Sequence, residues 1–309
     1  TAIASVWCLG PRSACDTRSV TNGFPTDPQA IDLMIAFPFK KADVYAFLRD
    51  QANDDESKSG AGDLAMPAGY MFSDVGEEPD PDEDVIDTCF AAMDAVGVAA
   101  GLFNVSDQAI EAKRRSPDRV HFSLEIDPND VMGAVREIRS AHAQHGIKAV
   151  TTFPAGCNPQ VPISDAKYYP IYATCVELDL PICPTVGVPG PRVPMECQRV
   201  HHVDQVCYDF PDLKLVMRHG CEPDEELAVK LMLKWPGLHY MTSAFSPKYY
   251  PQAIIDYANT RGTDKIMYAG YYPMGLSLDR IFEQLPAVPF RDRGWAPFLR
   301  ENAQRVFGL

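Results

Sequence analysis

The stretch Leu213-Lys-Leu-Val-Met-Arg-His-Gly220 has the form of a buried β-strand that ends at a glycine. A helical pattern follows it, in which acidic residues at 224–226 precede Leu227, Leu231 and Met232. Acidic side chains in a first turn interact favourably with the helix dipole. The stretch therefore predicts one strand-and-helix unit of a parallel sheet.

Seven more runs of the same kind lie on either side of this stretch, at 30–37, 98–105, 120–126, 147–153, 180–186, 238–244 and 265–271. Amphipathic helical patterns separate them, for example at 85–96 and 131–138. Near-continuous apolar strands alternating with helices are typical of a parallel sheet that is buried on both faces. Eight units predict a closed (β/α)8 TIM barrel in one domain, residues 30–309, with a doubly wound open sheet as the competing α/β fold.

Two segments do not follow the repeat. Residues 1–29 show little periodicity and are expected to form an irregular N-terminal extension that wraps the barrel or meets a neighbouring subunit. Residues 50–83 are rich in Asp, Glu and Pro and are expected to form a loop insertion after the first strand. Such a loop opens on the face of a barrel where active sites lie, so it is either a lid or a solvated surface loop.

Composition excludes several classes of function. The chain of 309 residues carries 28 basic and 42 acidic residues, a formal charge of −14, which argues against nucleic-acid or anionic-membrane binding. No apolar run approaches the roughly 18–20 residues of a membrane span, and no signal peptide is recognised. The start at Thr1 without Met suggests an upstream segment. Nine cysteines without CxxC pairs favour reduced thiols in a cytoplasmic protein, with a Cys8–Cys15 pair as the less favoured alternative.

Several stretches, in the right order from residue 30 onward, resemble the amidohydrolase-related family, in the branch that includes aminocarboxymuconate semialdehyde decarboxylase. They include Ala30-Ile-Asp-Leu-Met-Ile-Ala-Phe-Pro38, Phe210-Pro-Asp-Leu-Lys-Leu-Val-Met-Arg-His-Gly220, Asp264-Lys-Ile-Met-Tyr-Ala-Gly-Tyr-Tyr-Pro273 and Glu301-Asn-Ala-Gln-Arg-Val-Phe-Gly-Leu309. The resemblance implies a TIM barrel, and hydrolase or decarboxylase chemistry on a small molecule.

The resemblance fails at the metal ligands. The family ends its first strand in HxH, where this chain has Met34 and Ala36. The family's histidine of strand five aligns with Thr185, and its metal-binding Asp of strand eight aligns with Tyr271. Only His219 remains, and one imidazole with a thioether, a hydroxyl and a phenol is not a ligand set for Zn²⁺ or Mn²⁺. We therefore expect no catalytic metal and no cofactor.

Residues near the carboxyl ends of barrel strands are the remaining candidates. His219 is expected to act as general acid or base, and the Tyr271 hydroxyl to donate a proton or orient a carbonyl. The side chains expected to contact substrate are Met34, Ala36, Phe37, Thr185, Ser243, Cys157, Cys221 and Met274. Either cysteine would be a nucleophile if a neighbouring imidazole lowered its pKa, although a small buried hydrophobe is the commoner role.

Charged residues near these positions receive structural interpretations. If His219 faces the barrel, strand alternation turns Arg218 outward toward the helices, so few cations remain at the strand ends to hold a carboxylate. Glu125 is a spare carboxylate near the end of strand three, and Glu222 and Asp224 are helix N-terminal charges. His201 and His202 are adjacent and are not expected to chelate together.

Two hypotheses follow. The first is a metal-independent hydrolase or lyase that acts on a small cyclic or carboxylated metabolite, by lactone hydrolysis or decarboxylation. The second is a non-catalytic barrel that binds a ligand or completes a partner subunit. In either case we expect a homo-oligomer, most simply a dimer. The two hypotheses differ in whether polar groups converge at the barrel mouth or apolar side chains fill it.

Overall fold

The computed structural model describes residues 23–39, 51, 53, 54, 80 and 82–309. Eight parallel strands follow one another around a single sheet in the order of the sequence. They are β1 (Ala30–Asp32), β2 (Val98–Asn104), β3 (Val120–Glu125), β4 (Ala149–Thr152), β5 (Ile182–Pro184), β6 (Leu215–Met217), β7 (Leu238–Met241) and β8 (Ile266–Met267). This order is that of a (β/α)8 barrel.

Backbone contacts between the segments of β8 and β1 close the sheet. Ile35 and Tyr272 form an isolated parallel bridge. The amide of Tyr271 donates to the Met34 carbonyl at 2.9 Å, and the amide of Ala36 donates to the Tyr272 carbonyl at 2.9 Å. Since an open sheet has two unpaired edges, these bonds exclude the doubly wound alternative and confirm the barrel.

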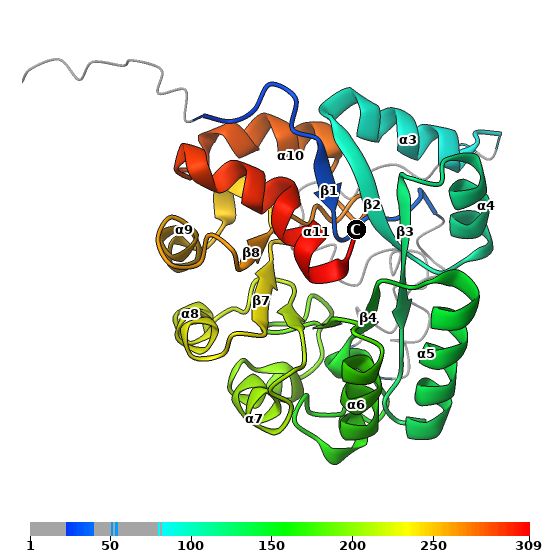
Figure 1. Cartoon of the computed structure of the whole chain (residues 1–309), viewed down its shortest axis with the longest axis vertical. Helices are drawn as coiled ribbons and strands as arrows, with labels where there is room; N and C mark the ends of the chain where they lie inside the picture. The colour runs from blue at the N-terminus through cyan, green and yellow to red at the C-terminus, as the bar shows by residue number, and fades with distance from the viewer. Residues whose placement is uncertain (1–22, 40–50, 52, 55–79, 81) are drawn as a thin grey trace, which may run out of the picture.

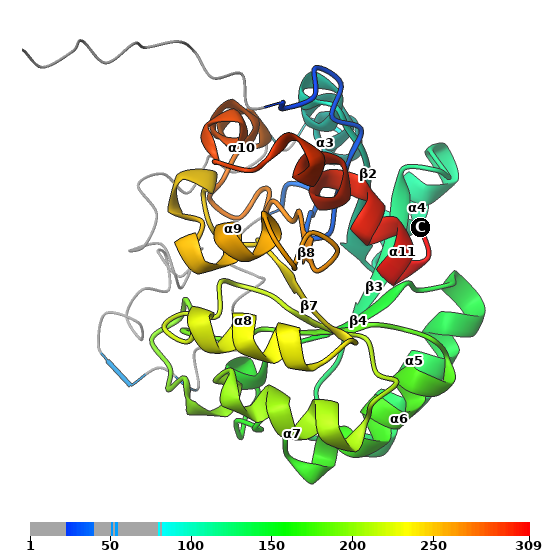
Figure 2. The ribbon, with the colours of Figure 1, turned by 60° about the vertical axis from the view of Figure 1, so that its left-hand side comes forward.

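Helices form a ring outside the strands (Figures 1 and 2). In chain order they are α3 (Val85–Val96), α4 (Asp107–Arg115), α5 (Val131–His145), α6 (Tyr169–Glu177), α7 (His201–Asp209), α8 (Glu225–Lys234), α9 (Gln252–Ala258) and α10 (Leu278–Gln284). A last helix, α11 (Asn302–Phe307), lies across one end of the barrel (Figure 1).

Strand alternation divides the apolar core into two clusters. The outer cluster lies between strands and helices and includes Leu215 and Met217 of β6. The inner cluster fills the barrel with Ile31, Ala100, Ala149, Val216 and Met267, and α11 adds Ala303, Val306 and Phe307. Lys148, just before β4, donates to the Gly308 carbonyl at 2.8 Å, so α11 covers the amino ends of the strands. The carboxyl ends of the strands lie at the opposite end of the barrel.

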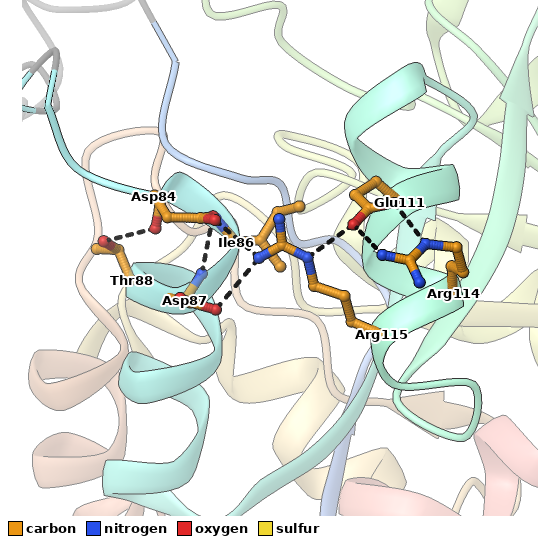
Figure 3. Close-up of polar contacts among 7 residues, drawn as sticks. All are labelled: Asp84, Ile86, Asp87, Thr88, Glu111, Arg114 and Arg115. Carbon is orange, nitrogen blue, oxygen red and sulfur yellow. Dashed lines mark hydrogen bonds and ion pairs between the residues drawn. The ribbon is translucent and has the colours of Figure 1, made fainter.

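Polar contacts join neighbouring helices on the surface (Figure 3). Asp84 caps α3 by accepting from the amides of Ile86 and Asp87 at 2.9 and 3.4 Å. Its second oxygen accepts from Arg115 of α4 at 2.7 Å, and Arg115 also contacts Glu111 at 2.9 Å. The Asp84 carboxylate thus serves as an N-cap and an interhelical ion pair at the same time.

All eight predicted strands are present, but each is shorter than its apolar run, mostly at the carboxyl end. The last residues of these runs leave the hydrogen-bonded ladder and form the barrel mouth. The predictions for 1–22, and for most of 50–83, lie outside the described residues. Two described residues of the latter contact loops that follow strands: Gln51 donates to the Gly156 carbonyl at 2.6 Å, and Asp54 pairs with Arg192 at 3.3 Å. Among the described helices, none is long and apolar enough to cross a membrane. Oligomerisation and cytoplasmic location stay predictions.

Candidate active site at the carboxyl ends of the strands

Left-handed backbone is concentrated where strands six, seven and eight end. His219 and Cys221 have φ values of 68° and 65°, with Gly220 at 88° between them. Ala244 follows β7 with φ of 70°, and Tyr271 follows β8 with φ of 92°. Each such non-glycine residue costs on the order of 1–3 kcal/mol, and residues of this kind cluster at functional sites. Both predicted catalytic residues are among them.

His219 and Tyr271, from different strands, lie against each other. Their rings meet edge to face with centroids 5.2 Å apart and planes at 80°. Ser243, which is fully buried, accepts a hydrogen bond from the His219 amide at 3.2 Å, and its Oγ lies 3.3 Å from His219 Nδ1. The structure thus joins His219, Tyr271 and Ser243 into one group, and Ser243 holds both the backbone and the ring of His219.

The His219 imidazole is neutral at ordinary pH. Its pKa is lowered to about 3, mainly because its surroundings are desolvated and secondly because the Arg218 cation is close, while the Ser243 hydrogen bond raises the pKa by less. The side chain as a whole remains only partly buried. A neutral imidazole is able to accept a proton at one ring nitrogen and to donate one from the other.

Arg218 points into the barrel, so its predicted outward orientation is wrong. Val216 of the same strand lies in the inner cluster, and alternation places Arg218 on the same side. Arg218 Nε donates to Thr185 Oγ1 at 3.1 Å, and Nη2 donates to the Thr152 carbonyl at 3.2 Å. The left-handed backbone at His219 breaks the alternation, so Arg218 and His219 both contact residues of the mouth. Arg218 therefore adds one cation to the few that were expected at the strand ends.

The other predicted contact residues divide into two groups. Met34, Ala36 and Met274 lie beside Tyr271: Tyr271 donates its amide to Met34, Ala36 pairs with the next residue, and the Met274 amide donates to the Tyr271 carbonyl at 2.8 Å. Thr185 is buried and holds Arg218. These four residues accompany the group formed by His219, Tyr271 and Ser243.

Phe37, Cys157 and Cys221 instead lie in the outer core cluster. Phe37 stacks on Phe103 with ring centroids 4.6 Å apart, and Cys221 Sγ lies 3.8 Å from the sulfur of Met217. Burial raises the pKa of the Cys157 and Cys221 thiols, so neither forms the nucleophilic thiolate easily. The structure places these three side chains in the packing between strands and helices.

Sequence reasoning missed Asp32, which holds the end of β1 against the segment that leads to Tyr271. Asp32 is fully buried, and its Oδ1 accepts from the amides of Met34 at 3.0 Å and Gly270 at 2.7 Å. Its Oδ2 lies near the Tyr268 hydroxyl, which is buried as well. Burial raises the pKa of Asp32 to about 7. A single acidic residue within the apolar run 30–37 was the available signal.

The remaining charged candidates lie outside this group. Glu125 is exposed at the end of β3, where its amide donates to Asn104 Oδ1 at 3.1 Å. Asp224 directly precedes α8, as predicted, and pairs with Arg199 at 2.7 Å.

The strand-end residues do not fit a divalent metal ion. Thr185 Oγ1, at one of the expected ligand positions, already accepts from a guanidinium, and a second cation beside Arg218 would be repelled. Within the described residues, potential metal-binding side chains converge only at Glu196, His201 and His202, on the surface. The two histidines are therefore closer than predicted, since they share the first turn of α7. However, both ring nitrogens of His202 are engaged, by Ser164 at 2.8 Å and by the Glu196 carbonyl at 3.0 Å.

A closed eight-stranded barrel with ionisable and strained residues at the carboxyl ends of its strands is the architecture of TIM-barrel enzymes. The family model described as amidohydrolase matches residues 31–309, so this chain belongs to the amidohydrolase family. The family resemblance found in the sequence is thereby confirmed. A search of curated proteins finds no significant match.

Solved structures of the same fold include three informative relatives. An uncharacterised TIM-barrel protein from Bordetella bronchiseptica is 21% identical with a TM-score of 0.69, covering 90% of this chain and 98% of its own. A 5-carboxyvanillate decarboxylase from Novosphingobium aromaticivorans, complexed with manganese and 4-hydroxy-3-methoxy-5-nitrobenzoic acid, is 17% identical with a TM-score of 0.64, covering 94% and 100%. A probable 2-pyrone-4,6-dicarboxylic acid hydrolase from Acinetobacter baumannii, with citric acid bound, is 13% identical with a TM-score of 0.60, covering 91% and 100%.

Proposed function

We propose that this chain is a hydrolase or a C–C or C–O lyase that acts on a small cyclic or carboxylated metabolite without a catalytic divalent metal. The observation that carries the proposal is the convergence of His219, Tyr271 and Ser243 at the carboxyl ends of the barrel strands. Two of these residues, His219 and Tyr271, hold left-handed backbone, a strained conformation of the kind that clusters at functional sites. The convergence of polar groups favours the enzyme over the non-catalytic barrel.

His219 has the role of general acid or base. Ser243 Oγ has two lone pairs, so it is able to accept from the His219 amide and from Nδ1–H together. In that tautomer Nε2 carries the free lone pair and accepts a proton from water or substrate. The Tyr271 phenol, held against the imidazole, donates a hydrogen bond to the oxygen on which charge develops.

The relatives support the choice of substrates for a first assay. The decarboxylase and the probable hydrolase are named for an aromatic acid and for a cyclic lactone with carboxylate groups. We propose that this chain acts on a molecule of the same general kind, and 5-carboxyvanillate and 2-pyrone-4,6-dicarboxylate begin the panel, followed by simpler aromatic acids and lactones.

The test compares the full-length protein before and after chelator treatment, together with His219→Asn and, as a control, the exposed His201→Asn. Asparagine tolerates left-handed backbone, so the first variant removes the imidazole with little change of fold. We expect chelation and His201→Asn to leave the rate unchanged, and His219→Asn to lower kcat/KM by roughly 10²–10⁴-fold. A rate that chelator abolishes and Mn²⁺ restores, or one that His219→Asn retains, would overturn the proposal.

A further inference from the structure

Arg218 is a buried cation without a charged partner among the residues that the structure describes. Its exposed fraction is 7%, and the two acceptors that it contacts, the Thr185 hydroxyl and the Thr152 carbonyl, are both neutral. Among the described residues, no carboxylate lies within the 4.0 Å that defines an ion pair with this guanidinium. Buried charges are normally paired because desolvation of a lone ion is expensive.

The two hydrogen bonds of Arg218 leave some of its N–H groups for a ligand. A guanidinium carries five N–H groups in a planar fork, and the two contacts above engage only part of it. Both contacts come from the β4 and β5 side, and the next residue along β6 is His219, whose ring lies against Tyr271. The cation therefore stands beside the proposed acid or base, inside the same barrel.

The two neutral acceptors also fix how the guanidinium is presented. Nε bonds to the Thr185 side chain and Nη2 to a backbone oxygen, so the plane of the group is set by two neighbouring strands. A cation that is oriented before a ligand arrives loses little conformational entropy on binding. Planar, two-pronged recognition of a carboxylate is the interaction for which arginine is best suited.

We propose that Arg218 is the permanent cation of this site and binds a carboxylate group of the substrate, in place of the metal ion that the fold family implies. The inference rests on the proposed function only in taking the barrel mouth as the substrate site. It further specifies the substrate as an anion, with one carboxylate against Arg218 and the reacting bond near His219.

A bound carboxylate would also raise the pKa of the His219 imidazole. The Arg218 cation contributes to the low pKa of this imidazole, after desolvation. An anion that neutralises the cation removes that contribution and makes His219 a stronger base when substrate is present.

The test measures binding rather than turnover, so it separates this inference from the proposed function. The probes are benzoate and acetate, with benzamide and acetamide as uncharged counterparts of the same shape, titrated into the full-length protein by calorimetry. The proteins are the wild type, Arg218→Met, Arg218→Lys and a control, Arg139→Met, which removes a surface arginine paired with Glu177.

We expect the wild type and Arg139→Met to bind at least one carboxylate at least tenfold more tightly than its amide, with affinity falling as salt is added. Arg218→Met should abolish the preference, and Arg218→Lys should keep part of it because the charge remains. The His219 ring resonance, assigned with His219→Asn, should titrate at higher pH when the carboxylate is bound.

Equal affinity for carboxylate and amide in the wild type would overturn the inference, as would a preference that survives in Arg218→Met. If Arg218→Met fails to fold, the inference is still tested by the affinities of the wild type and of Arg218→Lys for each carboxylate and its matching amide. A chain that prefers carboxylates through Arg218 but turns over none of the substrate panel would support this inference and contradict the proposed function.

Discussion

Asp32 should make the stability of this protein fall as pH rises from about 4 to 7. Its pKa is about 7 in the folded protein, against an ordinary value of 3.8, because the carboxyl group is fully buried. Between these two values the folded state keeps a proton that the unfolded chain has released, so raising the pH favours unfolding. The difference of about 3 pKa units, at ~1.36 kcal/mol each, corresponds to about 4 kcal/mol.

Asp32→Asn isolates this contribution. The asparagine Oδ1 is able to accept from the amides of Met34 and Gly270 as the carboxyl does, and its amide nitrogen lies beside the Tyr268 hydroxyl, but it does not ionise. We expect the variant to match the wild type near pH 4 and to exceed its free energy of unfolding by up to about 4 kcal/mol near pH 8.

The assay is urea denaturation of both proteins, and of the exposed control Asp212→Asn, at several pH values from 4 to 8. Contributions of other titrating groups, including the histidines, cancel in the difference between variant and wild type. A difference that does not change with pH, or a variant that is less stable than the wild type at pH 8, would refute the reasoning.

Three further predictions concern the same end of the barrel. Gly187→Ala should lower the free energy of unfolding, measured by urea denaturation, by more than Gly146→Ala does. At Gly187 φ is 102° and a Cβ would meet the Glu222 amide nitrogen at 2.7 Å, whereas nothing lies within 4 Å of a Cβ at Gly146. Equal losses of stability in the two variants would contradict this prediction. Cys221 should resist iodoacetamide at pH 8 in the folded protein and react once the protein is unfolded, because burial raises the pKa of its thiol. Mass spectrometry of the labelled peptides measures the extent of reaction. Rapid labelling of Cys221 in the folded protein would contradict the prediction. Ser243→Ala should lower kcat more than it raises KM, since Ser243 positions the His219 ring. Ser243→Thr, which keeps the hydroxyl, should recover part of the lost kcat. An unchanged kcat in Ser243→Ala would show that Ser243 has no role in the site.

The fold could be predicted from the sequence because its signals are local. Each strand is an apolar run such as 213–219, and each helix between strands has its own apolar stripe and, in α3 and α8, acidic residues at its start. Such patterns act over a few residues, and eight repetitions left few topologies to choose among. His219 and Tyr271 were found for the same reason, since each follows directly after a predicted strand.

The composition of the site depended on tertiary structure. With His219 facing inward, strand alternation predicted that Arg218 faces away from the barrel. In the structure the backbone is left-handed at His219, and both residues lie at the mouth. Nothing in the run 213–219 encodes that change, because it arises where the strand meets its neighbours.

The sequence by itself determined the barrel, the order of its strands and which residues stand at their carboxyl ends, because hydrophobic periodicity is a property of neighbouring residues. Only the tertiary structure decided which of those side chains meet. It joined Ser243 to His219, set Arg218 against Thr185 and placed Asp32 under the segment that carries Tyr271. These contacts join residues from 24 to 238 positions apart in the chain, and their geometry follows from how the closed sheet packs.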